Sequence, residues 1–222
     1  MKYIYLSHYL EDEIPTYGNN RVSLNITPIK SISKGDSANV YQFTMENHWG
    51  THIDAPAHFF FNAPSICDFQ AEHWIFKKSQ VIEIPPEEGK FIDVDILQRH
   101  KINTDTDLLL IKTGFQRWRG KEKYSIDNPG IKSDAALWLR KNYPSLRAIG
   151  FDFVSLSSYT DRDEGRKSHC AFLDPDGNGN PILIIEDMNL QASLEKLKDV
   201  WVFPLLIKGI DSAPCTVIGV FE

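Results

Sequence analysis

Three of the chain's seven histidines and one aspartate lie within eleven residues, in the segment HWGTHIDAPAH. These four side chains, His48, His52, Asp54 and His58, all occupy even positions, so a straight strand would place them on one face. A strand rises about 3.3 Å per residue, so His48 and Asp54 would lie roughly 20 Å apart. Metal ligands must bring their donor atoms to about 2 Å from a shared ion. If the cluster binds metal, the segment must therefore bend.

The residues between the histidines allow such a bend. Gly50 tolerates backbone angles that other residues avoid, and it adds no side chain to the space between the flanking imidazoles. Pro56 biases Ala55 toward an extended conformation and suits the first turn of a helix. The sequence therefore predicts a turn near Gly50 followed by a helix that begins near Pro56.

Metal binding competes with a simpler interpretation of these residues. Any one histidine of the segment, taken alone, is an ordinary surface or core residue. Four donor groups in a His-x3-His-x-Asp-x3-His pattern favour a metal site instead, because zinc, manganese and iron all bind neutral imidazole and carboxylate. The donor types do not distinguish among these metals.

The rest of the chain predicts one α/β domain, residues 1–222, built on a mixed sheet with few helices. Runs of branched apolar residues predict the strands, which are Val81–Ile84, Leu108–Lys112, Ala148–Phe151, Ile182–Ile185, Val202–Ile207 and Thr216–Val220. Two stretches have helical spacing, Ser133–Arg140 and Ser193–Lys198. Proline and glycine predict turns at residues 85–89 and 174–181.

Composition excludes several classes of function. The formal charge of −6, without a long basic run, argues against nucleic-acid binding and favours a small-molecule ligand. No apolar segment is long enough to span a membrane and no signal peptide is evident, so we expect a cytoplasmic protein. Cys67, Cys170 and Cys215 form no metal or disulfide pattern, which predicts buried free thiols.

The segment HWGTHIDAPAHF resembles the H-x-G-T-H-x-D-x-P-x-H motif of the cyclase-like metal-dependent hydrolases, the family that includes bacterial kynurenine formamidase and isatin hydrolase. The resemblance continues through Gly150–Asp152, Ser168–His169 and Ile184–Leu190, and so covers most of the chain. It implies a swivelling β/β/α fold and a homodimer or larger homo-oligomer.

The resemblance also implies roles for individual residues. His48, His52 and Asp54 would hold one divalent metal, zinc or manganese. Asp54 would bridge to a second ion also bound by His169, and Glu186 would contribute a shared carboxylate. His58 would donate and accept protons. Taken without the resemblance, His169 is equally well a polar residue beside a turn, and Glu186 a solvated residue at a strand end.

A pair of metal ions can lower the pKa of a water molecule and polarise a carbonyl group, which suits hydrolysis of amides or esters. We therefore expect an arylformamidase-like amidohydrolase that cleaves the C–N bond of a small amide, aryl formamide or cyclic amide, with lactones or esters as an alternative. The chain has Ala213-Pro214-Cys215-Thr216 where many relatives have Pro-x-Arg. An arginine contact to a substrate carboxylate is therefore not expected at this position.

Two other interpretations remain open at this stage. His52, Asp54 and His169 also fit the facial triad of an iron(II) oxygenase, although no arginine for a 2-oxoacid follows His169. A non-catalytic metal-stabilised protein is the second, but a structural zinc site is usually closed by four ligands, often cysteines.

The aromatic residues near the motif have a structural and a binding interpretation. Trp49, Phe59, Phe60, Phe61 and Trp74 are mainly expected in the core, with one or two rings left to contact a ligand. Near the N-terminus, Tyr5, His8, Tyr9 and Tyr17 could complete a pocket.

Overall fold

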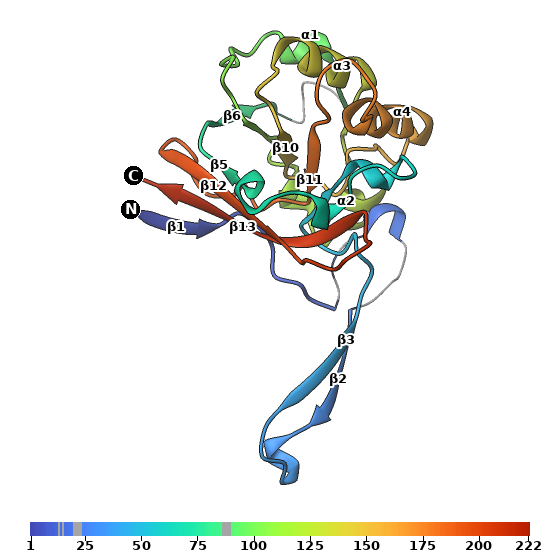
Figure 1. Ribbon diagram of the computed structural model, residues 1–222, viewed down its shortest axis with the longest axis vertical. Helices are drawn as coiled ribbons and strands as arrows, with labels where there is room; N and C mark the ends of the chain where they lie inside the picture. Colours follow the sequence, from blue (N-terminus) through green and yellow to red (C-terminus); the bar gives the residue numbers. More distant parts are fainter. Residues whose placement is uncertain (13, 15, 20–23, 86–89) are drawn as a thin grey trace.

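A computed structural model describes residues 1–12, 14, 16–19, 24–85 and 90–222. In these residues nine strands form one large mixed sheet (Figure 1). The strands, in sheet order, are β5 (Ile75–Phe76), β12 (Leu197–Pro204), β13 (Ser212–Phe221), β4 (His52–Asp54), β11 (Leu183–Glu186), β10 (Ala148–Phe151), β8 (Leu108–Lys112) and β6 (Ser79–Glu83), with β1 (Lys2–Tyr5) paired to β13. The strands at the two ends of this order, β5 and β6, are joined by only Lys77 and Lys78 in the chain. The two edges of the sheet therefore come close together, and the sheet is nearly closed.

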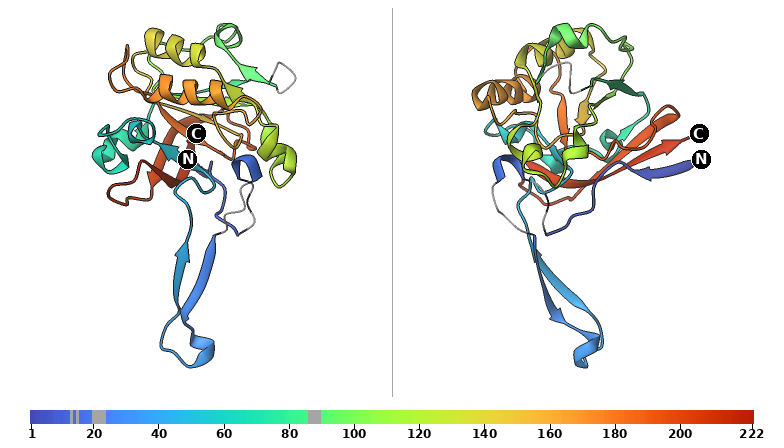
Figure 2. Two further views of the ribbon diagram at one scale, coloured as in Figure 1. Left: turned by 90° about the vertical axis from the view of Figure 1, so that its right-hand side faces the viewer. Right: turned by 180° about the vertical axis from the view of Figure 1, so that it is seen from behind.

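One half of the sheet is parallel and the other antiparallel. Strands β6, β8, β10 and β11 are parallel neighbours, and their branched apolar side chains are largely buried, as expected where both faces are covered. Helices α3 (Ser133–Asn142) and α4 (Arg162–Leu173) lie side by side over these strands (Figures 1 and 2). The remaining strands pair antiparallel.

The short strand β4 joins the two halves. It pairs antiparallel with β11 on one side and with β13 on the other, and all three of its residues are buried. The register places His52 opposite Glu186 and Asp54 opposite Ser212. The central part of the histidine motif therefore lies in the middle of the sheet.

A separate two-stranded arm, formed by β2 (Asn25–Lys30) and β3 (Val40–Thr44), extends away from the body (Figures 1 and 2). The described residues also form a small pair of strands, β7 (Phe91–Ile92) and β9 (Gly130–Ile131), and two short helices, α1 (Val94–Leu97) and α2 (Glu122–Ile126). Short 3₁₀ turns lie at Tyr17–Asn19, Ile32–Lys34, Pro56–His58, Ile66–Asp68, Ala71–Trp74 and Phe115–Trp118. In the described part of the chain, no helix is both long and apolar enough to cross a bilayer.

The fold corrects some of the expected elements. The helix predicted at Ser193–Lys198 is wrong, because Leu197 begins β12 and pairs with Phe221. Six residues make a marginal helix, and pairing in the sheet prevails over the leucine spacing. The strand predicted to reach Ile207 ends at Pro204. Helix α4 was not predicted, and the turn expected at residues 85–89 lies mostly outside the described residues.

Candidate metal centre

The histidine segment bends as its sequence indicates. Gly50 has φ 66°, in the left-handed region, and a Cβ atom there would lie 2.7 Å from the side chain of Leu10. The chain then forms β4 and enters a 3₁₀ turn that begins at Pro56 and ends at His58. The turn at Gly50 and the helical start at Pro56 are confirmed, with a three-residue strand between them.

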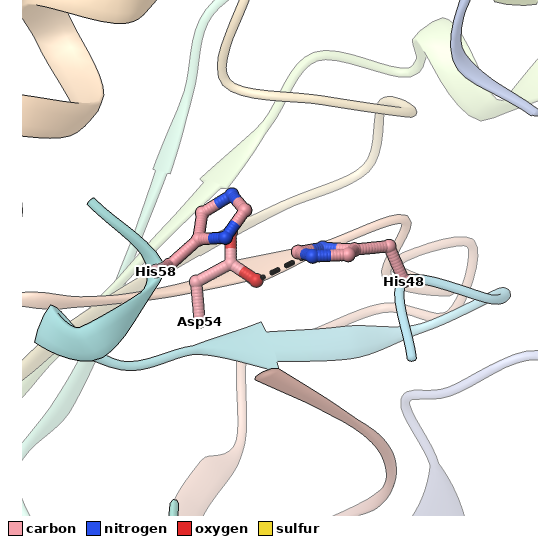
Figure 3. Close-up of side chains that lie close together, drawn as sticks. All are labelled: His48, Asp54 and His58. Carbon is pink, nitrogen blue, oxygen red and sulfur yellow. Dashed lines mark ion pairs between the residues drawn. The ribbon is translucent and has the colours of Figure 1, made fainter. Parts of the chain in front are cut away.

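This bend brings His48, Asp54 and His58 together (Figure 3). One ligand atom from each lies within 4.8 Å of the others, and His48 Nδ1 is 3.3 Å from Asp54 Oδ1. The centres of the His48 and His58 rings are 4.4 Å apart. Side chains that a straight strand would hold far apart thus share one small volume.

A second group of donors shares Asp54 with the first. His52, Asp54 and Glu186 also offer ligand atoms within 4.8 Å of one another. His52 Nε2 lies 3.3 Å from Glu186 Oε2, and His169 Nε2 lies 3.5 Å from Glu186 Oε1 and 4.0 Å from Asp54 Oδ2. All six residues named from the sequence therefore meet, and Asp54 belongs to both groups.

Backbone carbonyl groups orient two of the imidazoles. His52 Nδ1 is 2.8 Å from the carbonyl oxygen of Gly50, and His169 Nδ1 is 2.9 Å from that of Gly165, one turn earlier in α4. An Nδ1–H that donates to a carbonyl leaves the Nε2 lone pair directed elsewhere, which is the usual arrangement of a metal-binding histidine. Both Nε2 atoms lie next to the carboxylates described above.

A metal fits the unmet polar groups of this site. Asp54 Oδ1, Asp54 Oδ2 and His52 Nε2 are buried and have no hydrogen-bond partner. Buried polar atoms without partners are rare and destabilise a fold, unless an ion or water satisfies them. Imidazole nitrogen and carboxylate oxygen are suitable ligands for zinc or manganese. The donor set and its orphaned atoms thus agree with the metal implied by the sequence.

Electrostatics in the metal-free site depends on the same contacts. Burial alone would lower the pKa of His52, but the Glu186 carboxylate and the charge of Asp54 raise it to about 9. Burial would raise the pKa of Glu186, whereas His169 and His52 lower it to about 2. The pKa of Asp54 is also lowered, against its burial, by His48 and the other histidines. Without metal, protonated imidazoles therefore balance the negative charges of the two buried carboxylates. With metal bound, a divalent cation would balance these charges instead.

The loop that follows β10 holds Glu186 in place. The backbone N–H of Leu156 donates to Glu186 Oε1 over 2.7 Å, and the hydroxyl of Ser155 donates to the same oxygen over 3.4 Å. Glu186 is 4% exposed, so the solvated strand end considered from the sequence is wrong. His169 likewise lies inside α4 at 5% exposure rather than beside a turn.

Two further acidic residues of the site were missed in the sequence. Asp211 Oδ2 lies 2.6 Å from His58 Nδ1, and Asn47 donates to Asp211 Oδ1 over 2.9 Å. Asp187, which has φ 50°, forms a double hydrogen bond with Arg119 and accepts another from Tyr124. Asp187 directly follows Glu186 inside the segment Ile184–Leu190, and the resemblance of that segment was the signal that could have found it. Nothing near Asp211 in the sequence marked it.

The donor groups line a cavity of about 260 Å³. Tyr17, Phe59 and Val154 supply its less polar walls. Phe59 stacks on the ring of His169, with centroids 5.0 Å apart. Trp49 and Trp74 lie in the core as expected, whereas Phe61 is 95% exposed and was wrongly expected there.

The N-terminal aromatic residues divide between two places. Tyr17 lines the metal cavity, as the sequence suggested. Tyr5, His8 and Tyr9 instead line a different, larger groove at the base of the arm. They therefore do not complete the pocket around the metal donors.

The cysteines do not indicate a thiol nucleophile. All three are free, but only Cys215 is buried, Cys170 is half-buried and Cys67 is exposed, which corrects the expectation of buried thiols. Burial raises the pKa of both Cys170 and Cys215. A raised pKa reduces the thiolate fraction that nucleophilic attack requires.

The proposed oxygenase triad is also assembled, since His52, Asp54 and His169 surround one volume. A facial triad contains a single carboxylate. Here Glu186 adds a second buried carboxylate within 3.5 Å of both histidines, and His48 adds a further imidazole. This composition differs from a three-ligand site.

Comparisons with known proteins agree on one family. The family model described as putative cyclase matches residues 4–158. A kynurenine formamidase of Geobacillus thermodenitrificans is 31% identical over 160 residues, which cover 72% of each chain. Cyclase-like protein 1 of Arabidopsis thaliana is 24% identical over 218 residues, covering 94% of this chain and 81% of that protein.

Solved structures share the fold. Isatin hydrolase A from Labrenzia aggregata, bound to benzyl benzoate, superimposes with a TM-score of 0.79 at 19% identity, over 100% of this chain and 94% of that one. A predicted metal-dependent hydrolase from Bacillus stearothermophilus gives a TM-score of 0.74 at 19% identity, over 98% and 97% of the two chains. The large mixed sheet with few helices is therefore a known α/β architecture.

Proposed function

The chain belongs to the cyclase family, and on this premise we propose that it is a metal-dependent hydrolase that cleaves the C–N bond of a small amide, aryl formamide or cyclic amide. One observation carries the proposal. Asp54 belongs to both groups of donors, and its two buried carboxylate oxygens have no hydrogen-bond partner. A bridging carboxylate between two cations would satisfy both oxygens.

In this proposal His48, His52 and Asp54 would hold one ion, Asp54 and His169 would hold the second, and Glu186 would contribute a carboxylate shared by both. Zinc and manganese both suit these donors. The short distances between Glu186 and both His52 and His169 support its place in the site. His58 lies close enough to His48 and Asp54 to be a metal ligand itself. Measuring the metal content of a His58 variant separates this ligand role from a role in proton transfer.

Bound there, a pair of divalent cations would supply Lewis acidity, which lowers the pKa of a water molecule and polarises a carbonyl oxygen. The chain itself supplies the proton transfers. With Nδ1 donating to Asp211, the Nε2 lone pair of His58 can accept the proton that the attacking water loses and then pass it to the leaving nitrogen. The carboxylate of Asp211 fixes the orientation of the ring. Phe59 lines the cavity, and its apolar ring would restrict water at that wall.

Substrate size follows from the cavity. About 260 Å³, with an aromatic wall at Phe59 and Tyr17, suits a small and partly planar molecule. Two relatives carry the names kynurenine formamidase and isatin hydrolase, which supports aryl formamides and cyclic amides as first choices. Lactones and simple esters are the second choice for the same site, because the same groups would act on their carbonyl carbon.

The test combines metal analysis with a substrate screen. Purified protein is analysed for bound metals, then stripped and reloaded with zinc or manganese, and assayed on N-formyl aromatic amines, isatin-like lactams and simple esters. We expect hydrolysis that disappears with the metal and returns with it, while circular dichroism keeps a folded spectrum. Unfolding on chelation would favour a structural metal instead. Oxygen consumption that depends on iron and 2-oxoglutarate would favour the oxygenase.

The proposal also includes three further properties, which are a homo-oligomeric state, a swivelling β/β/α fold and a cytoplasmic location. They rest on the family and the sequence rather than on the metal site.

A further inference from the structure

Asp187, the residue that directly follows Glu186, has an unusual backbone conformation. Its φ of 50° lies in the left-handed region, which residues with a side chain rarely adopt, although aspartate tolerates it better than most. Such a conformation persists only where the surrounding contacts hold it. Glu186 is the last residue of β11, so the turn at Asp187 begins immediately beyond a proposed metal ligand.

The side chain of Asp187 is held by two residues from another part of the fold. Arg119 donates from Nε to Oδ1 over 3.0 Å and from Nη2 to Oδ2 over 2.9 Å, and the hydroxyl of Tyr124 donates to Oδ1 over 2.5 Å. Asp187 is 2% exposed, and Tyr124 is completely buried. Hydrogen bonds to a charged group are strong, and a planar guanidinium that donates twice also fixes the orientation of the carboxylate. We call Arg119, Tyr124 and Asp187 the clamp.

The backbone of Asp187 is fixed as well. Its N–H donates to the carbonyl oxygen of Phe153 over 2.9 Å, and its carbonyl oxygen accepts a hydrogen bond from the hydroxyl of Thr51 over 2.5 Å. Thr51 directly precedes His52, whose Nε2 lies 3.3 Å from Glu186. Asp187 therefore connects the two chain segments that carry these proposed ligands.

The segment that supplies the clamp also contacts the chain beyond Asp187. Arg119 follows the 3₁₀ turn Phe115–Trp118, and Tyr124 lies in α2. Within that turn, Gln116 Oε1 accepts a hydrogen bond from the backbone N–H of Leu190 over 2.9 Å. The residues that follow β11 are thus held at two points by one segment.

The carboxylate of Asp187 is not placed as a further metal ligand. Asp187 lines the same cavity as Glu186, but both of its carboxylate oxygens accept hydrogen bonds from the clamp. Both oxygens of Asp54, in contrast, have no hydrogen-bond partner. The two converging groups of donors among the described residues do not include Asp187. Its carboxylate therefore anchors the chain, while the carboxylate of Glu186 lies beside the histidines.

The donors of the clamp keep their protons at neutral pH. Burial alone would lower the pKa of Arg119, but the carboxylate of Asp187 raises it. Burial, together with the charge of Asp187, raises the pKa of Tyr124 well above its ordinary value. A charged guanidinium and a neutral phenol are the forms that donate to a carboxylate.

We propose that Arg119 and Tyr124, acting through Asp187, are positioning residues for Glu186. The clamp fixes the peptide unit that joins Asp187 to Glu186, and therefore the end of β11, from which the Glu186 carboxylate reaches His52. The inference rests on the proposed function in one respect, namely that Glu186 contributes to the metal site. Contacts that orient a ligand from behind change metal affinity by about 10–100-fold when they are removed.

The experiment measures metal binding directly, without an enzymatic assay. Metal-free protein is titrated with cobalt(II), whose visible absorption reports the geometry of its ligands, and zinc affinity is measured by competition with a chromophoric chelator. Tyr124→Phe removes one hydrogen bond, and Arg119→Gln removes the guanidinium and its double contact. We expect zinc affinity to fall about tenfold in the first variant and about a hundredfold in the second, with a changed cobalt spectrum in both.

Matched variants elsewhere separate positioning from a general loss of stability. Tyr143 is a half-buried tyrosine that packs on Trp138, and Arg147 donates to two backbone carbonyl groups near the start of β11 rather than its end. Tyr143→Phe and Arg147→Gln should keep the wild-type zinc affinity and cobalt spectrum, even where the melting temperature falls. Equal losses of affinity in these controls would overturn the positioning role.

Asp187→Gly tests whether the backbone angle alone is sufficient. Glycine adopts the left-handed conformation freely but offers the clamp no carboxylate. We expect this variant to lose zinc affinity as Arg119→Gln does, and the double variant to lose no more than either single one, because both changes break the same contact. Wild-type affinity in Asp187→Gly would overturn the proposal.

The remaining outcomes distinguish this inference from the proposed function. If the wild-type protein binds neither cobalt nor zinc, the proposed function fails and the inference fails with it. If the wild type binds metal and the clamp variants bind it with unchanged affinity and spectrum, only the inference fails. Should Arg119→Gln not fold by circular dichroism, Tyr124→Phe decides the question, because it removes a single oxygen atom.

Discussion

His58 Nδ1 lies 2.6 Å from Asp211 Oδ2, although 153 residues separate the two in the chain. The contact depends on the register of β13 with β4, which places Ser212 opposite Asp54 and so brings the residue before β13 to the end of the histidine segment. Asp211 is thus a positioning residue for the imidazole that we assign to proton transfer.

Asp211→Asn keeps the shape of this contact and removes its charge. Hydrogen bonds to charged groups contribute about 1.5–3 kcal/mol, and Asp211 is partly exposed, so we expect kcat to fall by about tenfold. KM and metal content should change little. The measurement is steady-state kinetics with metal analysis. Asn47→Ala, which removes the amide that donates to Asp211 Oδ1, should have a smaller effect. Unchanged kcat across the pH range would contradict the positioning role.

His58→Ala removes the proposed proton donor without removing an assigned ligand. We expect near-normal metal content and hydrolysis lower by about a hundredfold or more, the usual scale of a lost general acid–base group. Parallel loss of metal and activity would instead make His58 a ligand, as its distance from His48 and Asp54 allows. Wild-type turnover would count against both roles.

Asp54→Ala and its isostere Asp54→Asn test the shared carboxylate. Both should lose bound metal and activity, because Asp54 alone belongs to both donor groups. Asp68→Ala changes an exposed aspartate elsewhere and should keep full metal and activity. Elemental analysis of the purified proteins decides the question, and full occupancy in Asp54→Asn would refute the bridging role.

The elements that the sequence predicted well are those that local pattern determines. Strands Leu108–Lys112 and Ala148–Phe151 are found with the predicted bounds, because uninterrupted apolar runs suit a buried parallel strand. The helix predicted at Ser133–Arg140 is found at Ser133–Asn142, only two residues longer than predicted. The motif at residues 48–58 also carried its own bend in Gly50 and Pro56.

The missed features depend on long-range contacts. Helix α4 is predominantly polar, and its buried face shows only at scattered positions such as His169. Pro28 interrupts the strand pattern of β2, and every residue of β2 and β3 is exposed. Asp211 is defined as a site residue only by the pairing of β13 with β4. No local spacing encodes these contacts.

Gly165→Ala tests how α4 positions His169. A Cβ atom at Gly165 would lie 2.2 Å from Ser157 Oγ and 2.8 Å from Ser157 Cα, so the helix or the loop must move. Forcing extra atoms into a packed site costs about 1–3 kcal/mol. We expect a lower melting temperature and weaker metal binding, since Gly165 also supplies the carbonyl that orients His169. Lys167→Ala, on the exposed side of α4, is the control and should change neither measurement.

The raised pKa of His52 predicts opposite pH trends with and without metal. Its folded pKa of about 9 exceeds the unfolded value of 6.5, so its contribution to metal-free stability is complete below pH 6.5 and is lost as the pH rises toward 9. His169, with its pKa also raised by Glu186 against burial, changes in the same direction.

In the loaded protein, protons compete with the metal for the same imidazoles, so metal affinity and the stability it confers increase over that range. Thermal melts with a chelator and with excess metal should therefore diverge between pH 6.5 and about 9. Glu186, with its pKa lowered to about 2, adds stability that is lost only as the pH falls below about 4.5 through that value, outside this window. Parallel melting curves in the two conditions would show that the metal does not replace the protons on these histidines.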